Sequence, residues 1–462
     1  MATKYIIRTI VFIVLVVFLT SITRAQNWFN SNITTVRTNV RTDTEVQKIK
    51  AYNDSILVGI SKTNNLKFYD LFVCKNNSTT IYHNYISDTN IIVSDIAFLG
   101  DSVYFCGKIM LNSLDSRGII GRVNINSLIG SINSQYDIDT ISGTQELKQL
   151  AVHRKPSSQY VTLYAIGNNG YNLNPTGRFV VMHFSPYDSI SNYTIFDGFS
   201  FSSNSQEIFE DICITDNYIV TLSRIHPNNT FIIRCYDMFF SLNNSYNHVF
   251  NFQNITMNHT SNFSEFPLHI SALKGDTVAV AFSGIDDQTF FTMINILNPT
   301  SNIIQRNQLI YHTDKENKTL EMDYSIKGNR LLVLTKCKLN SVGVAQTITL
   351  LKPNEFQPYI TEMDYFSAPF ALNHICAMKE KQYALAGTYI GSFNSKFHSI
   401  AVKLIDHQSS SCLSNSQILT GITNTTNGYS IPSLSNPTHN SNIFISNIFI
   451  HSMGSLTSLC NE

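Results

Sequence analysis

The chain has 462 residues, of which 14% are charged and 43% hydrophobic, and its 32 basic and 32 acidic residues cancel. This balance argues against a broad nucleic-acid or anionic-membrane surface, because such surfaces need an excess of Lys and Arg. Thirty Phe and 22 Tyr at such low charge exclude a disordered chain and favour strands over helices.

Residues 1–25 have the parts of a secretory signal peptide. Lys4 and Arg8 give a positive start, residues 10–19 are an apolar run too short to span a bilayer, and small residues precede a cleavage site before Gln26. We therefore expect a cleaved signal peptide and a mature chain without an integral membrane segment. That chain would be secreted, or held in the periplasm or at the cell surface. An uncleaved N-terminal anchor is the alternative.

From residue 44 onward the sequence repeats a unit about every 54 residues. Each copy opens with a polar residue on a short apolar strand, turns on Gly, Asp, Asn or Ser, and enters a second apolar strand that often closes on Gly or Ser. Residues 95–107 and 211–223 are the clearest copies. The opening residues are Lys48, Asp95, Gln149, Asp211, His269, Asp323 and His374.

Each unit also carries a third strand and a hairpin turn into a fourth, as residues 179–188 and 292–301 illustrate. Four short strands in each of seven units, with no amphipathic helix pattern, predict an all-β fold. The expected architecture is a seven-bladed β-propeller of four-stranded antiparallel blades over residues 44–411. A blade that is apolar on both faces needs a neighbour on each side, which a closed ring supplies. A parallel β-helix is the alternative, although its coils are usually shorter than these units.

The residue two positions after each opening residue is small in six of the seven copies, whereas the first copy has Lys50. Residues two apart in a strand share a face, and the inner strands of a propeller converge on its axis. We therefore interpret the small residues as a sign of crowding at the axis. They are Ala97, Ala151, Cys213, Ser271, Ser325 and Cys376.

The two ends of the chain offer two ways to close the ring. Residues 26–43 contain a spare N-terminal strand that can pair into the last blade. The competing clasp is residues 442–450, within a Ser-, Thr- and Asn-rich C-terminal segment that spans residues 412–462. Cys412 and Cys460 bracket that segment and are the predicted disulfide pair. The cysteines inside apolar strands are expected to behave as small buried hydrophobes, and they are Cys74, Cys106, Cys213, Cys235 and Cys376.

One unit carries a recognisable repeat motif. The run Gly100-Asp-Ser-Val-Tyr-Phe-Cys-Gly107, with the apolar strand at residues 122–125, resembles the repeats of bacterial secreted β-propeller proteins. Those repeats carry a pattern like D-x-x-G-N-x-Y-x-x-G. The likeness extends over residues 44–410 but is close only in the second unit. It implies a propeller fold and does not imply a reaction.

The sequence contains no G-x-S-x-G elbow, H-E-x-x-H motif, Walker loop, dinucleotide fingerprint or repeated Asp-box. We therefore expect no catalytic residue, no cofactor and no metal. The candidate ligand site is the ring of opening residues, because carboxylates and imidazoles that converge on a channel can bind a polar ligand or a divalent cation. The alternative is that they only solvate the mouth of a channel. The candidates are Asp95, Asp211, His269, Asp323 and His374.

Two further acidic patterns carry weaker signals. Glu207, Glu210 and Asp211 form a cluster that suits either acid–base work or a solvated loop. Asp137-Ile-Asp139 has a faint calcium-like spacing without the remaining ligands.

A repeated tetrapeptide and a polar segment complete the search. Glu-Met-Asp-Tyr occurs at residues 321–324 and 362–365, at different places in the unit, which indicates coincidence. Residues 167–177 are rich in Gly and Asn and predict a loop at one rim, which is either a recognition loop or a tolerated insertion.

These observations predict an exported β-propeller that binds or scaffolds a protein or a glycan through rim loops or the axial mouth. The alternative is an extracellular glycoside hydrolase or lyase that uses acidic residues at the axial mouth, and a purely structural surface module is a third possibility. Perturbed acids clustered in one pocket would favour the enzyme. Exposed aromatic patches at a rim without perturbed acids would favour binding.

Overall fold

The computed structural model describes residues 34–37, 44–63, 68–75, 80–85, 91–112, 115–125, 133–139, 144–154, 159–171, 174–184, 190–202, 205–226, 230–238, 246–251, 268–286, 289–299, 304–311, 317–339, 343–351, 361–367, 370–379, 382–390, 396–404, 415–419, 422–423, 442–448 and 453–458. This part of the chain consists of strands and turns and contains no α-helix, which confirms the all-β prediction. Within these ranges no helix has the length and apolar character needed to cross a membrane. The predicted signal peptide, Cys412 and Cys460 lie outside the described residues.

Most strands belong to ladders, which are runs of antiparallel strands that pair in chain order. The strands that begin the ladders are β2 (Thr44–Asn53), β6 (Ile91–Leu99), β10 (Thr144–Arg154), β14 (Ser205–Ile214), β18 (Leu268–Ala272), β22 (Asn317–Ser325) and β26 (Phe370–Ala377). Every opening residue of the repeat lies on one of these strands.

The later strands of each ladder follow at short intervals. The second strands are β3 (Ile56–Thr63), β7 (Ser102–Met110), β11 (Val161–Tyr171), β15 (Tyr218–His226), β19 (Val278–Asp286), β23 (Arg330–Leu339) and β27 (Gln382–Ile390). The third strands are β4 (Phe68–Lys75), β8 (Ser116–Asn124), β12 (Asn174–Phe184), β16 (Thr230–Asp237), β20 (Thr289–Leu297), β24 (Gly343–Leu351) and β28 (Lys396–Leu404). The outer strands are β5 (Thr80–Tyr85), β9 (Asn133–Asp139), β13 (Ile190–Ser202), β17 (Tyr246–Asn251), β21 (Ile304–Tyr311) and β25 (Thr361–Ser367).

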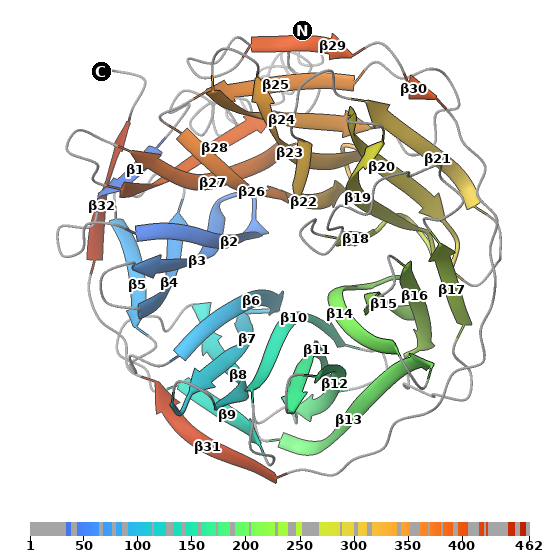
Figure 1. Cartoon of the computed structure of the whole chain (residues 1–462). Coiled ribbons are helices and arrows are strands. Elements are labelled where there is room, and N and C mark those ends of the chain that lie inside the picture. The colour runs from blue at the N-terminus through green and yellow to red at the C-terminus, as the bar shows by residue number, and fades with distance from the viewer. Residues whose placement is uncertain are drawn as a thin grey trace, which may run out of the picture.

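The ladders are arranged around a central axis, with their first strands innermost and their outer strands at the periphery (Figure 1). The inner strands contact one another in the order β2, β6, β10, β14, β18, β22 and β26, and β26 contacts β2 again. This ring of radiating antiparallel ladders is a β-propeller architecture. An open stack of coils, the alternative for a repeat of this length, would not bring β26 back to β2.

The hydrophobic core lies between neighbouring ladders. Val58 and Ile60 of β3 pack in one buried cluster with Val103 and Phe105 of β7. The first and last ladders are joined in the same way, because Ile49, Leu57 and Phe72 cluster with Cys376, Ala384 and Ala386. Each ladder therefore buries apolar side chains on both faces, as the repeat predicts. Each fully buried Val, Leu, Ile or Phe side chain among them contributes roughly 1.5–3 kcal/mol.

A β-bulge lies near the start of most inner strands. The pairing of inner and second strands shifts just before Lys48, Asp95, Gln149, Asp211, Glu321 and His374. Gly107 and Gly167 lie opposite two of these bulges, where a Cβ would overlap the carbonyl oxygens of Ile92 and Glu146. The small residue that often closes the second strand of the repeat is thus required by the bulge.

Segments from both chain ends pair with the periphery of the ring. β1 (Thr34–Arg37) pairs with β28, and β32 (Met453–Ser458) lies between β1 and β5. β31 (Asn442–Ile448), the strand within the expected C-terminal clasp, pairs with β9 instead. β29 (Asn415–Leu419) pairs with β25, and β30 (Ile422–Thr423) pairs with β21. These strands cover outer edges at several points around the ring (Figure 1).

The segment predicted as a rim loop at residues 167–177 is mostly a β-hairpin. β11 and β12 stay in register from Val161↔Phe184 to Tyr171↔Asn174. The Gly and Asn residues suggested a loop, but continuous backbone pairing with the neighbouring strand overrides their weak strand propensity.

Candidate functional site

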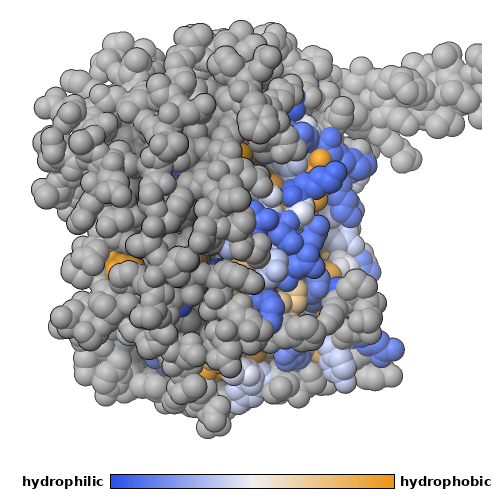
Figure 2. Space-filling view, turned by 90° about the vertical axis from the view of Figure 1, so that its right-hand side faces the viewer, coloured by the Kyte–Doolittle hydropathy of each residue, from blue (hydrophilic) through white to orange (hydrophobic). Residues whose placement is uncertain are grey.

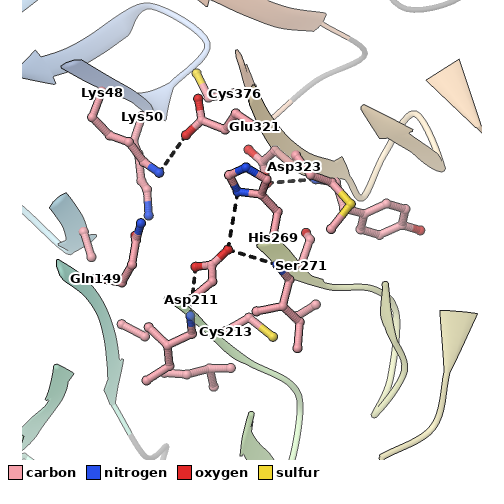
Figure 3. Close-up of a pocket in the computed structure, with 18 of the residues that line it drawn as sticks. Lys48, Lys50, Gln149, Asp211, Cys213, His269, Ser271, Glu321, Asp323 and Cys376 are labelled. Atoms are coloured by element: carbon pink, nitrogen blue, oxygen red, sulfur yellow. Dashed lines mark hydrogen bonds and ion pairs between the residues drawn. The ribbon is translucent and has the colours of Figure 1, made fainter. Parts of the chain in front are cut away.

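A cavity of about 360 Å³ lies on the axis of the ring, where the inner strands converge (Figure 3). Of the predicted ligand residues, Asp211, His269 and Asp323 line this cavity, while Asp95 and His374 lie beside it and contact its charged residues. The inward-facing side chains come from two positions on each strand. Those that line the cavity are Lys48, Lys50, Ala97, Gln149, Ala151, Asp211, Cys213, His269, Ser271, Glu321, Asp323 and Cys376.

We name the two levels by their place in the strand. The first tier holds the opening residues Lys48, Asp95, Gln149, Asp211, His269, Glu321 and His374. The second tier, two residues further on, holds Lys50, Ala97, Ala151, Cys213, Ser271, Asp323 and Cys376.

The structure corrects the position of the sixth opening residue. The bulge in β22 lies between Thr319 and Glu321, so Glu321 occupies the place that Asp211 has after the bulge in β14. Asp323, the predicted opener, belongs to the second tier. Alternate residues share a strand face, so a slip of two residues leaves the polar and apolar pattern unchanged. Glu321 was missed for that reason, although it stands in the first Glu-Met-Asp-Tyr copy on inner strand β22.

The first-tier carboxylates join neighbouring ladders. The Asp95 Oδ2 atom accepts the Leu150 N–H at 3.0 Å, and the Asp211 Oδ2 atom accepts the Ile270 N–H at 2.9 Å. The Glu321 Oε2 atom accepts the Ile375 N–H, also at 2.9 Å. Each donor lies on the inner strand of the next ladder, one residue after its first-tier residue. These acids therefore have a structural role, whatever else they do.

Lysine and histidine side chains lie beside these carboxylates. The Lys48 Nζ atom lies 2.6 Å from Glu321 Oε1 and 3.9 Å from Asp95 Oδ1. His374 Nδ1 lies 3.3 Å from Glu321 Oε2, and its Nε2 atom lies 3.1 Å from the Val46 carbonyl oxygen. His269 Nδ1 is 3.8 Å from Asp211 Oδ2. Glu321 is thus held by two basic groups, and Asp211 has only a long contact with one.

This unequal pairing gives Glu321 and Asp211 different pKa values. Burial alone would raise the pKa of Glu321, but Lys48 and His374 outweigh it and hold that pKa well below its usual range. Burial raises the pKa of Asp211 to about 6, and Lys48 and two backbone N–H groups offset it only in part. Burial also raises the pKa of Asp323. Burial disfavours the charge on Lys48, yet Glu321 and Asp95 raise its pKa overall.

The second tier is hollow, not crowded. Its small side chains border the open volume of the cavity, so we correct the interpretation of Ala97 and Ala151 as tightly packed positions. In the corrected register Ser325 leaves this tier; it is buried at the end of β22, where its Oγ accepts the Gly328 N–H at 3.1 Å. Lys50 and Asp323 are then the two charged members of the second tier.

The carboxylate cluster at residues 207–211 divides into three environments. Glu207 is fully buried in a bidentate ion pair with Arg234. Glu210 lies 3.3 Å from Arg224 Nε and 3.8 Å from Lys148 Nζ, while Asp211 faces the axis. The cluster is therefore not a paired acid–base site.

The remaining features play no part in the cavity. Asp137 and Asp139 lie within strand β9 rather than in a calcium-binding loop, and no group in the described part of the chain could hold a metal ion. The second Glu-Met-Asp-Tyr copy lies on outer strand β25.

Four described cysteines carry free thiols. Cys106, Cys235 and Cys376 are buried, as predicted, whereas Cys213 is only half-buried and faces the cavity. Burial raises the pKa of Cys213 and Cys376 well above the ordinary value, which makes both thiols poor nucleophiles. The side chain of Cys74 is outside the described set.

No family model matches the chain, and no curated protein matches it. Among solved structures, it is similar to the Dos1 propeller at 9% identity and a TM-score of 0.40, covering 79% of this chain and 93% of that one. It is also similar to the WD40 domain of SCAP from fission yeast at 8% identity and a TM-score of 0.29, covering 80% of this chain and 97% of that one. At these scores neither structure adds to the argument from the strand topology.

Proposed function

We propose that this chain is an exported, seven-bladed β-propeller that binds a protein or glycan partner through its axial cavity. The observation that carries the proposal is the cavity itself, into which charged and polar side chains from most of the inner strands project. Ligand sites are typically concave and hold a few convergent polar groups.

The blade count rests on the inner strands and their ladders. Seven inner strands contact one another in a closed circle, and each begins a run of consecutive antiparallel strands. Six runs contain four strands, and β1 supplies a fourth strand to the last run by pairing with β28. We propose that β1, with β32 beside it, closes the ring where the two chain ends meet.

The rim gives weaker support for binding. Exposed large hydrophobic residues in the described part of the chain are Leu111, Tyr160 and Ile326, which lie in three different connections between strands. Where described residues reach the side of the molecule shown in Figure 2, that surface is mainly hydrophilic with scattered apolar spots. We therefore place recognition at the axis, where Ile326 borders the cavity.

The binding proposal is tested by filling the cavity. A library of peptides and glycans is screened for thermal stabilisation of the wild-type protein, and each hit is measured again with Ala151→Phe. Ala151 lines the cavity, so its Phe variant should lose binding, whereas the control Ser55→Phe in the exposed β2–β3 turn should retain it. Hits that bind Ala151→Phe unchanged would place recognition at the rim and refute the axial site.

Export is proposed from the first 25 residues alone. The protein is expressed in a secreting host, and the N-terminus of the exported form is sequenced. We expect a chain that starts at Gln26, because the small residues before it fit the cleavage site. A membrane-bound chain that retains Met1 would support the uncleaved anchor instead.

An extracellular glycoside hydrolase or lyase is the second candidate. Its support is the presence of Asp211, with a pKa of about 6, and Glu321, with a pKa far below it, in one cavity. Such a separation is what a general acid and a general base require. The test is turnover of a polysaccharide and chromogenic glycoside panel by wild type, Asp211→Asn and Glu321→Gln. Turnover that both variants abolish would establish the enzyme, and its absence in wild type would contradict it.

A further inference from the structure

Two charged side chains interrupt the otherwise small second tier. Lys50 lies on β2 and Asp323 on β22, and Cys376 on β26 lies between them around the ring (Figure 3). Lys50 acts electrostatically on both Asp323 and Cys376, so the three groups face one part of the cavity. The opposite side has small walls, formed by Ala97, Ala151, Cys213 and Ser271.

Lys50 retains hydrogen-bonding capacity. Its Nζ atom lies 3.7 Å from Asp95 Oδ1, which is beyond hydrogen-bond distance, and its side chain is 36% exposed. An ammonium group has three donors, and among the described residues none of them forms a hydrogen bond. Lys48 differs, because its ammonium is held at 2.6 Å by Glu321.

Asp323 is a fixed acceptor. Its Oδ1 atom accepts the Tyr324 N–H and its Oδ2 atom accepts the Ala377 N–H, both at 2.8 Å. These bonds orient the carboxylate and leave further lone pairs on both oxygens. In the described structure no ion pair joins Lys50 to Asp323. A cation and an anion on either side of Cys376 therefore remain available for a ligand that carries both charges.

We propose that the axial cavity binds a small zwitterion of the α-amino-acid type, with its carboxylate on Lys50 and its ammonium on Asp323. This inference rests on the proposed axial binding site and goes beyond the protein or glycan partner by naming a small-molecule ligand for it. The ligand's side chain points toward the small wall at Ala97 and Ala151. A volume of about 360 Å³ is at the lower end for ligand pockets, which suits one amino acid.

The electrostatics of the neighbouring acids agree with a ligand ammonium. Burial raises the pKa of Asp211 and of Asp323, and Lys48 and Lys50 offset that rise only in part. A ligand ammonium near Asp323 would stabilise its carboxylate further. A ligand with a carboxylate alone would add to the excess of acids.

The test compares three probes that share one side chain and differ at the α-amino or the α-carboxyl group. Leucine, leucinamide and N-acetylleucine are titrated calorimetrically into the full chain at pH 7.5 and low salt. We expect leucine to bind at least tenfold more tightly than either analogue. Lys50→Met should weaken the affinity for leucine at least tenfold and leave the affinity for leucinamide unchanged. Lys50→Arg should restore the affinity for leucine. Lys274→Met, in the exposed β18–β19 turn, is the matched control.

The outcomes separate this inference from the axial function. If either analogue binds as tightly as leucine and Ala151→Phe abolishes that binding, the axial site is supported. The inference that the ligand must carry both charges is then wrong. If leucine binds and Lys50→Met leaves its affinity unchanged, the assignment of the leucine carboxylate to Lys50 is wrong. If leucine does not bind, the inference fails, while the peptide and glycan screen still decides the axial function.

Discussion

Asp211 offers a quantitative test of the axial electrostatics. Its pKa is about 6 in the folded protein against an ordinary value of 3.8, and its side chain is 15% exposed. A raised folded pKa means that the folded state binds the proton more tightly than the unfolded state. The stabilising contribution is therefore full below 3.8 and is lost as pH rises through about 6. Between pH 4 and pH 7.5 this loss amounts to roughly 2–3 kcal/mol.

The assay isolates that loss with Asp211→Asn, which cannot titrate. Asp211 accepts hydrogen bonds from the backbone N–H groups of Ile212 and Ile270, and Asn has one oxygen with which to accept only one of them. The lost hydrogen bond lowers the free energy of unfolding by about 1–3 kcal/mol at every pH. Other titrations, including those of Glu321 and Asp323, occur in both proteins. The difference in unfolding free energy between wild type and variant should thus fall by about 2–3 kcal/mol from pH 4 to pH 7.5.

Urea unfolding followed by circular dichroism at the two pH values measures this difference. The control is Asp216→Asn, which removes an exposed carboxylate from the turn of the same β14–β15 hairpin. A difference for Asp211→Asn that stays constant would show that Asp211 ionises without a burial penalty. A difference that grows with pH would show that the pKa of Asp211 is lowered in the folded protein, as for a carboxylate stabilised by its neighbours.

The other predictions concern packing, pairing and metals. Ala97→Phe should change the unfolding free energy by less than about 1 kcal/mol, because the ring enters the cavity; overpacking would cost about 1–3 kcal/mol and restore the crowded-axis interpretation. Arg234→Met should cost about 3–5 kcal/mol in urea unfolding, because it strands the buried Glu207 charge, whereas Lys108→Met in a partly exposed pair should cost less than about 1 kcal/mol. Gly107→Ala should lower the melting temperature through its overlap with the bulged strand, and an unchanged value would argue against that bulge. EDTA should leave the melting temperature unchanged, and a clear drop would reveal a structural metal.

The repeat made the strand order predictable because its signals are local. A polar opener, a turn residue and an apolar run recur in each unit, and the closing Gly of the second strand reports the bulge through steric contact. Pairing across long sequence separations leaves no such trace. The hairpin at residues 167–177 has loop-like composition, and the partner of residues 442–448 is more than 300 residues away, on β9.

The sequence predicted that polar residues of the inner strands form a ring at the axis, but it did not identify every residue of that ring. Asp95, Asp211 and His269 follow from the alternation of inner strands, since each opens a clear unit. The alternation does not identify Glu321 or the tier of Asp323, because a shift of two residues leaves the alternation unchanged. Only the bulge in β22 fixes which residue opens the strand. Lys50 was visible as an exception, and its meaning required the cavity that surrounds it.

The first tier also suggests how the proposed seven-bladed ring closes. In the proposed ring, acids occupy the second, fourth and sixth inner strands, and Lys, Gln or His occupy the others. An odd ring cannot alternate throughout, so two basic residues, His374 and Lys48, become neighbours where the chain ends meet. The contacts resolve this conflict, because Lys48 and His374 both reach Glu321, and His374 also meets the Val46 carbonyl on the first inner strand. Glu321 therefore holds the closing junction, and replacing it should weaken ring closure more than replacing Asp95 or Asp211 would.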